Sequence, residues 1–173
     1  MWNELQEKGF IKFNIKDLTL LKEFFSSRYA ILPWEELNLN PPQKLIEECT
    51  KYLDNEPFLK EFIPYIRTTT CILDKGYSVE PHNDMSPFSP WMAQLFLKAN
   101  DEEEAEIRFG TREELISYPI SSGDLFFFYT FPSDFICYIP PLKVPTYVIN
   151  ILPCLEEKKE DNWIFSNITL EES

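Results

Sequence analysis

The residues best suited to chemistry are an imidazole and a carboxylate two positions apart, His82 and Asp84. Side chains at positions i and i+2 of an extended chain point to the same side, so both groups would face one point at a strand end. A histidine nitrogen and a carboxylate oxygen supply two ligands of a facial 2-His-1-carboxylate site, which suits non-haem iron(II) and leaves coordination positions open. The pair alone is equally consistent with a simple hydrogen bond between its members.

The remaining composition excludes several other kinds of site. His82 is the single histidine, so a second histidine ligand from this chain is impossible, and a Ser-His-Asp triad would have to use His82. The sequence has 4 Gly and neither a GxGxxG nor a GxxxxGK pattern, which excludes the common phosphate-binding loops. Its cysteines, Cys49, Cys71, Cys137 and Cys154, form no CxxC pair of the kind found in zinc ribbons or thioredoxin-like sites.

Charge and hydropathy limit the partners and the compartment. Sixteen Lys and Arg against 29 Asp and Glu give a net charge of −13. Such a surface repels phosphate backbones and anionic lipid headgroups, so we expect neither nucleic acid nor a membrane as a partner. No apolar run approaches the roughly 18 residues of a membrane span, and the charged first eight residues lack the apolar centre of a signal peptide. These features predict a cytoplasmic protein with free thiols.

The elements that must position the pair are mostly short strands. The chain of 173 residues fits one domain, and its 44% hydrophobic and 16% aromatic content can form a core. Gly76, Gly110 and Gly123 lie between β-rich runs, where a positive φ is needed. This pattern predicts a mainly β fold, a sandwich or jelly roll. Eight strands are expected, at 66–73, 78–82, 91–97, 105–109, 115–120, 124–131, 135–139 and 146–152.

The first sixty residues predict a helical layer. Apolar residues recur on one helical face within 17–25, with Asp17 as a candidate N-cap residue, and again over 43–53 after Pro41 and Pro42. We therefore expect a single domain over 1–173, with a helical N-terminal layer over 1–62, a β core over 63–154 and an acidic C-terminal segment over 155–173. The helices are expected to pack on the sheet.

Taken in order, these pieces resemble the double-stranded β-helix of the 2-oxoglutarate- and iron(II)-dependent oxygenases, in particular the prolyl-4-hydroxylase-like branch. Pro81-His82-Asn83-Asp84 resembles the family's Pro-His-x-Asp, and 93–97 resembles the core strand that follows it. The acidic stretch and strand over 100–109 resemble a family hairpin, and 120–128 resembles the family's glycine turn and strand. The match covers most of the chain and implies a cupin-like jelly roll with N-terminal helices.

The resemblance also implies an activity. The protein would be a dioxygenase that uses iron(II) and 2-oxoglutarate to hydroxylate or otherwise oxidise a small molecule or a peptide. His82 and Asp84 would be the catalytic residues and would hold Fe(II) or another divalent metal, which 2-oxoglutarate would chelate. Tyr77, which could line the pocket, and Lys98, which could reach a carboxylate from a neighbouring strand, are candidate cofactor-binding residues.

Two positions depart from the family's pattern. The second metal-binding histidine of the family is replaced by Cys137, and the basic residue that pairs with 2-oxoglutarate has Thr146 or Tyr147 near its place. Cys137 is therefore either a third metal ligand or a small buried core residue. In the latter case the site has two protein ligands or has lost its metal. The alternative functions are a catalytically inactive binding protein of this fold, or a metal-binding protein that does not use 2-oxoglutarate.

Overall fold

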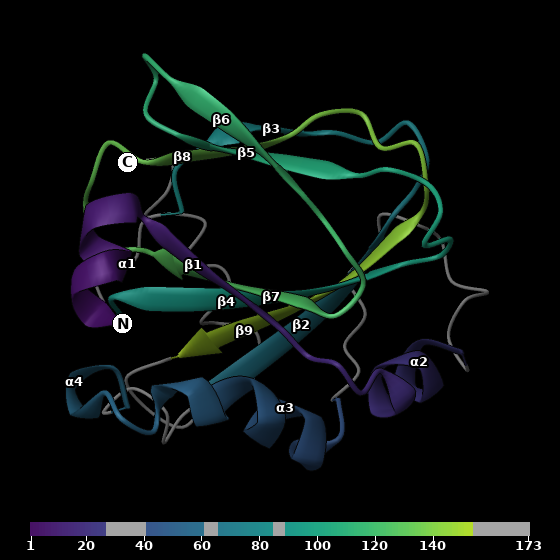
Figure 1. Ribbon diagram of the computed structural model, residues 1–173, viewed down its shortest axis with the longest axis horizontal. Coiled ribbons are helices and arrows are strands. Elements are labelled where there is room, and N and C mark those ends of the chain that lie inside the picture. The colour runs from purple at the N-terminus through teal and green to yellow at the C-terminus, as the bar shows by residue number, and fades with distance from the viewer. Residues whose placement is uncertain (27–40, 61–65, 85–88, 154–173) are drawn as a thin grey trace.

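The computed structural model describes residues 1–26, 41–60, 66–84 and 89–153. Two antiparallel sheets face each other, and helices cover the outer face of one of them (Figure 1). The five-stranded sheet has the order β1-β7-β4-β9-β2, and the four-stranded sheet has the order β3-β8-β5-β6. This is the expected jelly roll with helices packed on one sheet. The acidic segment 155–173 lies outside the described residues.

The elements follow one another with the helices concentrated before residue 61. In chain order they are α1 (Trp2–Lys8), β1 (Phe10–Asn14), α2 (Thr19–Ser26), α3 (Gln43–Thr50), the 3-10 helix η1 (Lys51–Leu53), α4 (Pro57–Lys60), β2 (Ile66–Leu73), β3 (Val79–His82), β4 (Trp91–Lys98), β5 (Glu106–Gly110), β6 (Leu115–Pro119), β7 (Asp124–Tyr129), β8 (Ile136–Ile139) and β9 (Thr146–Pro153). In the described part of the chain, no helix has the length and apolar character needed to cross a bilayer.

The eight expected strands are all present, each within two residues of its expected bounds. The helices expected after Asp17 and Pro42 also form, and the Asp17 carboxylate accepts a hydrogen bond of 3.0 Å from the Thr19 backbone N–H. The predicted helical N-terminal layer also contains one strand that was not predicted, because residues 10–14 form β1. This segment carries aromatic and β-branched side chains and pairs with β7 along its whole length, so sheet pairing prevails over the helical surroundings.

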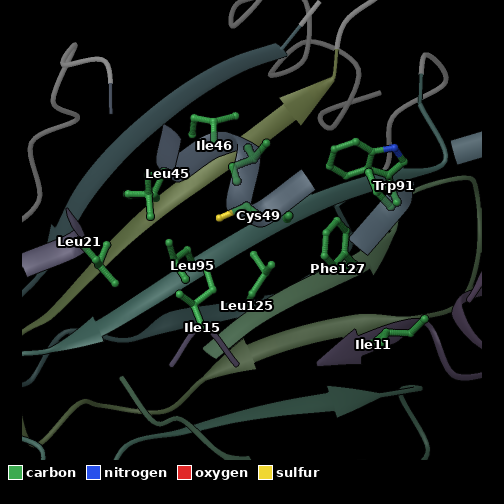
Figure 2. Packing of buried hydrophobic residues seen from close by; sticks show 14 of the residues in the cluster. Ile11, Ile15, Leu21, Leu45, Ile46, Cys49, Trp91, Leu95, Leu125 and Phe127 are labelled. Atoms are coloured by element: carbon green, nitrogen blue, oxygen red, sulfur yellow. The ribbon is translucent and has the colours of Figure 1, made fainter. Parts of the chain in front are cut away.

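The outer core lies between the five-stranded sheet and the helices, and its side chains are apolar (Figure 2). Alternate residues of the central strands face it, because side chains alternate between the two faces of a strand. From the helices, Leu21, Leu45 and Cys49 pack against this face. The strand residues that line it include Trp91, Ala93, Leu95 and Leu97 of β4 and Ile149 and Ile151 of β9.

The inner core lies between the two sheets and is rich in phenylalanine. Phe96 meets Phe126 edge to face at 5.6 Å between ring centroids, and Phe126 stacks on Phe128 at 5.8 Å. Ile107 and Cys137 face them from the opposite sheet. These rings pack the space between the sheets closely, which fixes the separation of the sheets and gives the strand ends defined positions.

The inner core has two ends, which the path of the chain distinguishes. The turn at 74–77 connects β2 to β3, and there the N–H of Gly76, whose φ is 87°, donates to the Leu142 carbonyl at 2.7 Å. We call this the closed end. From the turn, β3 runs to the opposite end, where it stops at His82. We call that the open end.

Candidate functional site

A bulge in β3 turns His82 toward the inner core. Val79 pairs with Ile139 and His82 pairs with Cys137, so three steps along β3 correspond to two steps along β8. The extra residue reverses the alternation of side chains, and His82 therefore lies on the inner face like Val79. Pro81 stands inside this irregular stretch of an edge strand, where its missing N–H is tolerated.

His82 and Asp84 meet at the open end. The His82 Nε2 lies 3.1 Å from the Asp84 Oδ1, and the side chains are 38% and 23% exposed. Between them, Asn83 turns away and donates from its Nδ2 to the Ser133 carbonyl at 2.8 Å, which ties the segment to the chain before β8. The pair is thus held within reach of solvent at the rim of the inner core.

The second nitrogen of the ring fixes which atom faces the carboxylate. His82 Nδ1 lies 2.7 Å from the Glu80 carbonyl oxygen, and a carbonyl can only accept, so Nδ1 carries the hydrogen of this bond. In the neutral ring, Nε2 then presents a lone pair to the carboxylate oxygen. Two acceptors at this distance require a cation between them, either a proton or a metal ion.

The spacing suits a metal ion. Two ligand atoms at about 2.1 Å from one ion and at right angles to each other lie about 3 Å apart. The separation of Nε2 and Oδ1 matches that value. An imidazole whose other nitrogen donates to a backbone carbonyl is also the usual supported form of a histidine ligand. These two residues therefore fit a divalent metal.

Cys137 lies next to the pair but differs from it in character. It stands opposite His82 in the ladder and is buried. Burial, and to a smaller extent the negative charge of Asp84, raise the pKa of its thiol, whereas the metal-binding form of cysteine is the thiolate. Among the described residues, no three His, Cys, Asp or Glu side chains gather around one point as a metal site requires. The role of Cys137 as a third ligand remains a prediction.

The residues predicted to bind a cofactor lie away from the open end. Tyr77 is 42% exposed in the turn of the closed end. Thr146 is buried at the start of β9, beside Leu73, and its hydroxyl donates to the Val144 carbonyl at 3.1 Å. Tyr147 faces the outer core and stacks on Phe25 at 4.9 Å between centroids. None of these three is brought near His82, and their role in cofactor binding remains a prediction.

Lys98 supports a turn at the same closed end. Its Nζ donates to the backbone carbonyls of Asp101 and Glu103, at 3.3 and 2.8 Å. It lines an open groove of about 450 Å³ together with acidic residues of 101–106 and with Lys143. The ammonium group thus stabilises the acidic turn that follows β4. This turn lies at the end of β4 that is farther from His82.

A row of polar side chains on the inner face was missed by the sequence analysis. Gln94 of β4 donates from Nε2 to the Asn150 Oδ1 at 2.8 Å, and Asn150 of β9 donates from Nδ2 to the Thr69 Oγ1 of β2 at 3.1 Å. We call Thr69, Gln94 and Asn150 the polar row. Its signal in the sequence is a polar residue at an inward position of otherwise apolar strands, as in 91–97 and 148–152.

The two amides of the polar row are partly exposed. Gln94 and Asn150 are half-buried although their strands lie inside the five-stranded sheet. The next inward residues toward the closed end, Phe96 and Val148, are 0% and 2% exposed. The amides of the polar row are therefore partly exposed, whereas the inward residues beyond them toward the closed end are buried.

Solved structures share this fold. The prolyl-4-hydroxylase of Pseudomonas putida aligns with a TM-score of 0.64 and 10% identity, over 91% of this chain and 92% of that one. The Trichoplax adhaerens prolyl hydroxylase, solved with a hypoxia inducible factor peptide fragment, gives 0.63 and 13%, over 88% and 86%. The viral collagen prolyl hydroxylase of Paramecium bursaria Chlorella virus gives 0.61 and 13%, over 84% and 96%. No family model and no curated protein matches the sequence.

At identities of 10–13%, this likeness defines the fold and leaves the activity open. The shared architecture agrees with the jelly roll of the oxygenases that the sequence resembles. Proteins of one fold differ in activity according to the residues of their sites.

Proposed function

We propose that this protein is an oxygenase of the 2-oxoglutarate- and iron(II)-dependent type, in which His82 and Asp84 hold the metal at the open end. The fold it shares with prolyl hydroxylases supports this proposal. The observation that carries it is the placement of Nε2 and Oδ1 3.1 Å apart, with Nδ1 already occupied by the Glu80 carbonyl. A divalent ion between these two atoms would take ligands from both residues without moving either side chain far.

Each residue of the segment has a separate task in this proposal. Fe(II), when bound, supplies the oxidising chemistry together with O₂ and 2-oxoglutarate. His82 and Asp84 hold the ion, the Glu80 carbonyl orients the imidazole, and Asn83 fixes the segment to the chain before β8. The apolar inner core beneath them limits the access of water to the reacting groups.

The substrate is proposed to be a small molecule or a peptide that reaches the open end. One similar structure holds a peptide fragment, which supports a peptide as one of the two classes. The half-exposed position of His82 and Asp84 supports access by a group that projects from a larger substrate. A buried site would favour small molecules alone.

The first experiment measures metal binding. The protein is loaded with Fe(II) under anaerobic conditions and dialysed, and bound iron is determined by elemental analysis. We expect about one equivalent in the wild type and a loss of at least about tenfold in affinity in His82→Ala and in Asp84→Ala, because each removes a ligand. Asp54→Ala is the matched control, since Asp54 is 59% exposed and pairs with Lys60 at the surface. Equal iron retention by all four proteins would contradict the proposed site.

The second experiment measures succinate released from 2-oxoglutarate by the iron-loaded protein under air. Release that depends on His82 and Asp84 supports the proposal. Iron binding without succinate release indicates the alternative of a metal-binding protein that does not use 2-oxoglutarate. The absence of both indicates a catalytically inactive binding protein of the same fold.

A further inference from the structure

Strand β6 forms one edge of the four-stranded sheet, and among the described residues it pairs with β5 alone (Figure 1). At the end of this ladder the Ile120 N–H donates to the Ala105 carbonyl at 2.8 Å. Residues that bond to the neighbouring strand alternate with residues that face away from it. The backbone N–H and C=O groups of Leu115 and Ser117, at odd positions, therefore point away from β5 along an open edge.

This edge lacks the features by which exposed strands usually avoid pairing. No charged residue or proline occurs over 115–118, and Pro119 stands only at the last position of the strand. Ile116 is 47% exposed although it lies within the strand. It is opposite Phe109, whose side chain belongs to the inner core, so it extends the apolar inner face to the edge. The edge thus offers an added strand both hydrogen bonds and an apolar contact.

We propose that β6 pairs antiparallel with β6 of a second copy of this chain, about a two-fold axis at Ile116. In this register Leu115 of one copy lies opposite Ser117 of the other, so every outward N–H and C=O group of these two residues is paired. The two Ile116 side chains come directly opposite each other, with their Cβ atoms about 5 Å apart, and shield each other from solvent. The four-stranded sheets of the two copies then form one continuous sheet.

The sequence of the strand favours this register over its neighbours. A two-fold axis at Ser117 would place the Leu115 carbonyl opposite Pro119, which has no N–H to donate. An axis at Leu115 would place the exposed Ile116 opposite the carboxylate of Glu114. The axis at Ile116 avoids both mismatches, because Pro119 then comes opposite the exposed turn after β5, where water can bond to a free carbonyl.

Charges at the ends of the paired strands also favour a second copy as the partner. In this register the exposed Arg112 of one copy comes opposite Ile120 of the other. Ile120 lines the open groove of about 450 Å³, in which the acidic residues of 101–106 outnumber Lys98 and Lys143. A cation brought to this groove offsets part of the repulsion between two chains that each carry a net charge of −13.

The proposal goes beyond the proposed function and is separate from the metal site. In the four-stranded sheet, β8 and β5 lie between β6 and β3, the strand that ends at His82. Failure of iron binding therefore leaves the pairing of β6 untouched, and a monomeric protein leaves the metal site untouched.

The test measures self-association of the full chain by sedimentation equilibrium between about 1 μM and 1 mM. We expect a reversible monomer–dimer equilibrium in the wild type. Ile116→Lys places two like charges opposite each other at the axis and is expected to weaken dimerisation by at least about tenfold. Phe58→Lys is the matched control, since Phe58 is 42% exposed on α4, and it should dimerise like the wild type.

A second pair of variants separates strand pairing from association through apolar side chains. Ser117→Pro removes an outward N–H that β5 does not use, so the edge strand tolerates it, while hydrogen bonds across the axis are lost. We expect at least about tenfold weaker dimerisation. Ser117→Ala keeps the N–H and should dimerise like the wild type, although both variants lose the hydrogen bond from the Ser117 hydroxyl to Glu106.

Three results would overturn the proposal. They are undiminished dimerisation of a folded Ser117→Pro, equal weakening by Phe58→Lys and Ile116→Lys, and a wild type that stays monomeric throughout the range. The last result would leave the β6 edge to a strand of another protein. If Ser117→Pro does not fold, the comparison of Ile116→Lys with Phe58→Lys decides the matter.

Discussion

The two faces of the five-stranded sheet differ, although the same strands form both. On the outer face, β4 and β9 present apolar side chains that the helices bury. On the inner face the same strands alternate phenylalanine and valine with Gln94, Asn150 and Lys98. A buried amide adds little to stability even when it is hydrogen-bonded, and costs free energy when it is not. The outer face is therefore apolar throughout, whereas the inner face combines a buried aromatic core with partly exposed amides that add little to stability.

Substitutions of two adjacent residues on opposite faces of β4 are expected to change the free energy of unfolding by very different amounts. Leu95→Ala removes a side chain that is 0% exposed in the outer core, and we expect it to destabilise the fold by about 2–5 kcal/mol. Gln94→Leu, one residue earlier and on the inner face, should change stability by less than about 1 kcal/mol or increase it. The free energy of unfolding in urea measures both. A loss for Gln94→Leu as large as that for Leu95→Ala would show that the inner face serves mainly to stabilise the fold.

A buried thiol in the outer core is expected to make the free energy of unfolding depend on pH. Burial raises the pKa of the Cys49 thiol from 9.0 to about 12. In the unfolded chain this thiol ionises near pH 9, whereas in the folded chain it stays protonated. Its contribution to stability is therefore complete below about pH 9 and falls by up to ~1.4 kcal/mol per pH unit above it. Urea unfolding between about pH 8 and 10.5 should show this slope reduced in Cys49→Ala. An unchanged slope in that variant would assign the pH dependence to other groups.

One substitution on the inner face, Cys137→His, is expected to strengthen iron binding. Cys137→His places an imidazole opposite His82, and we expect iron to be retained about tenfold more tightly, at a cost of about 1–3 kcal/mol in stability for the larger side chain. Iron retention after anaerobic dialysis and urea unfolding measure the two effects. Cys71→His, on the inner face of β2, is the control for adding a histidine elsewhere between the sheets. Better retention in Cys71→His than in Cys137→His would contradict the proposed position of the metal.

The smallest effects are expected at the closed end. Lys98→Met removes two hydrogen bonds to backbone carbonyls at the surface and should change stability by less than about 1 kcal/mol. It should leave iron retention and succinate release unchanged. Loss of succinate release in a variant that still retains iron would support the sequence prediction that Lys98 binds a cofactor.

The sequence predicts the strands of this fold better than it predicts the site. Alternating apolar residues with glycine turns between them are local signals, and they define all eight strands of the β core. Strand β1 was missed because only its partner β7, more than a hundred residues later, makes residues 10–14 extended. Pairing across such a distance leaves no periodic signal in five residues.

The geometry of the site depends on how the strands pair, which the spacing of residues along the sequence does not show. The rule of alternation brings His82 and Asp84 together, but only the bulge before His82 makes the ring face inward. Thr146 and Tyr147 are neighbours in sequence and face opposite sides of the sheet. A shift of one residue in matching the family's basic residue therefore moves the predicted side chain from the inner face to the face that the helices cover. The polar row joins three strands far apart in the chain, and its hydrogen bonds become visible only in the fold.

Pro81 has a further consequence for how the molecule behaves among its own copies. An exposed sheet margin invites strands of other molecules to add to it and so begin aggregation. A proline there cannot donate to an incoming strand, and the irregular backbone beside it offers no regular template. The irregular stretch that orients the His82 ring therefore also protects the β3 edge of the four-stranded sheet against pairing with strands of other molecules.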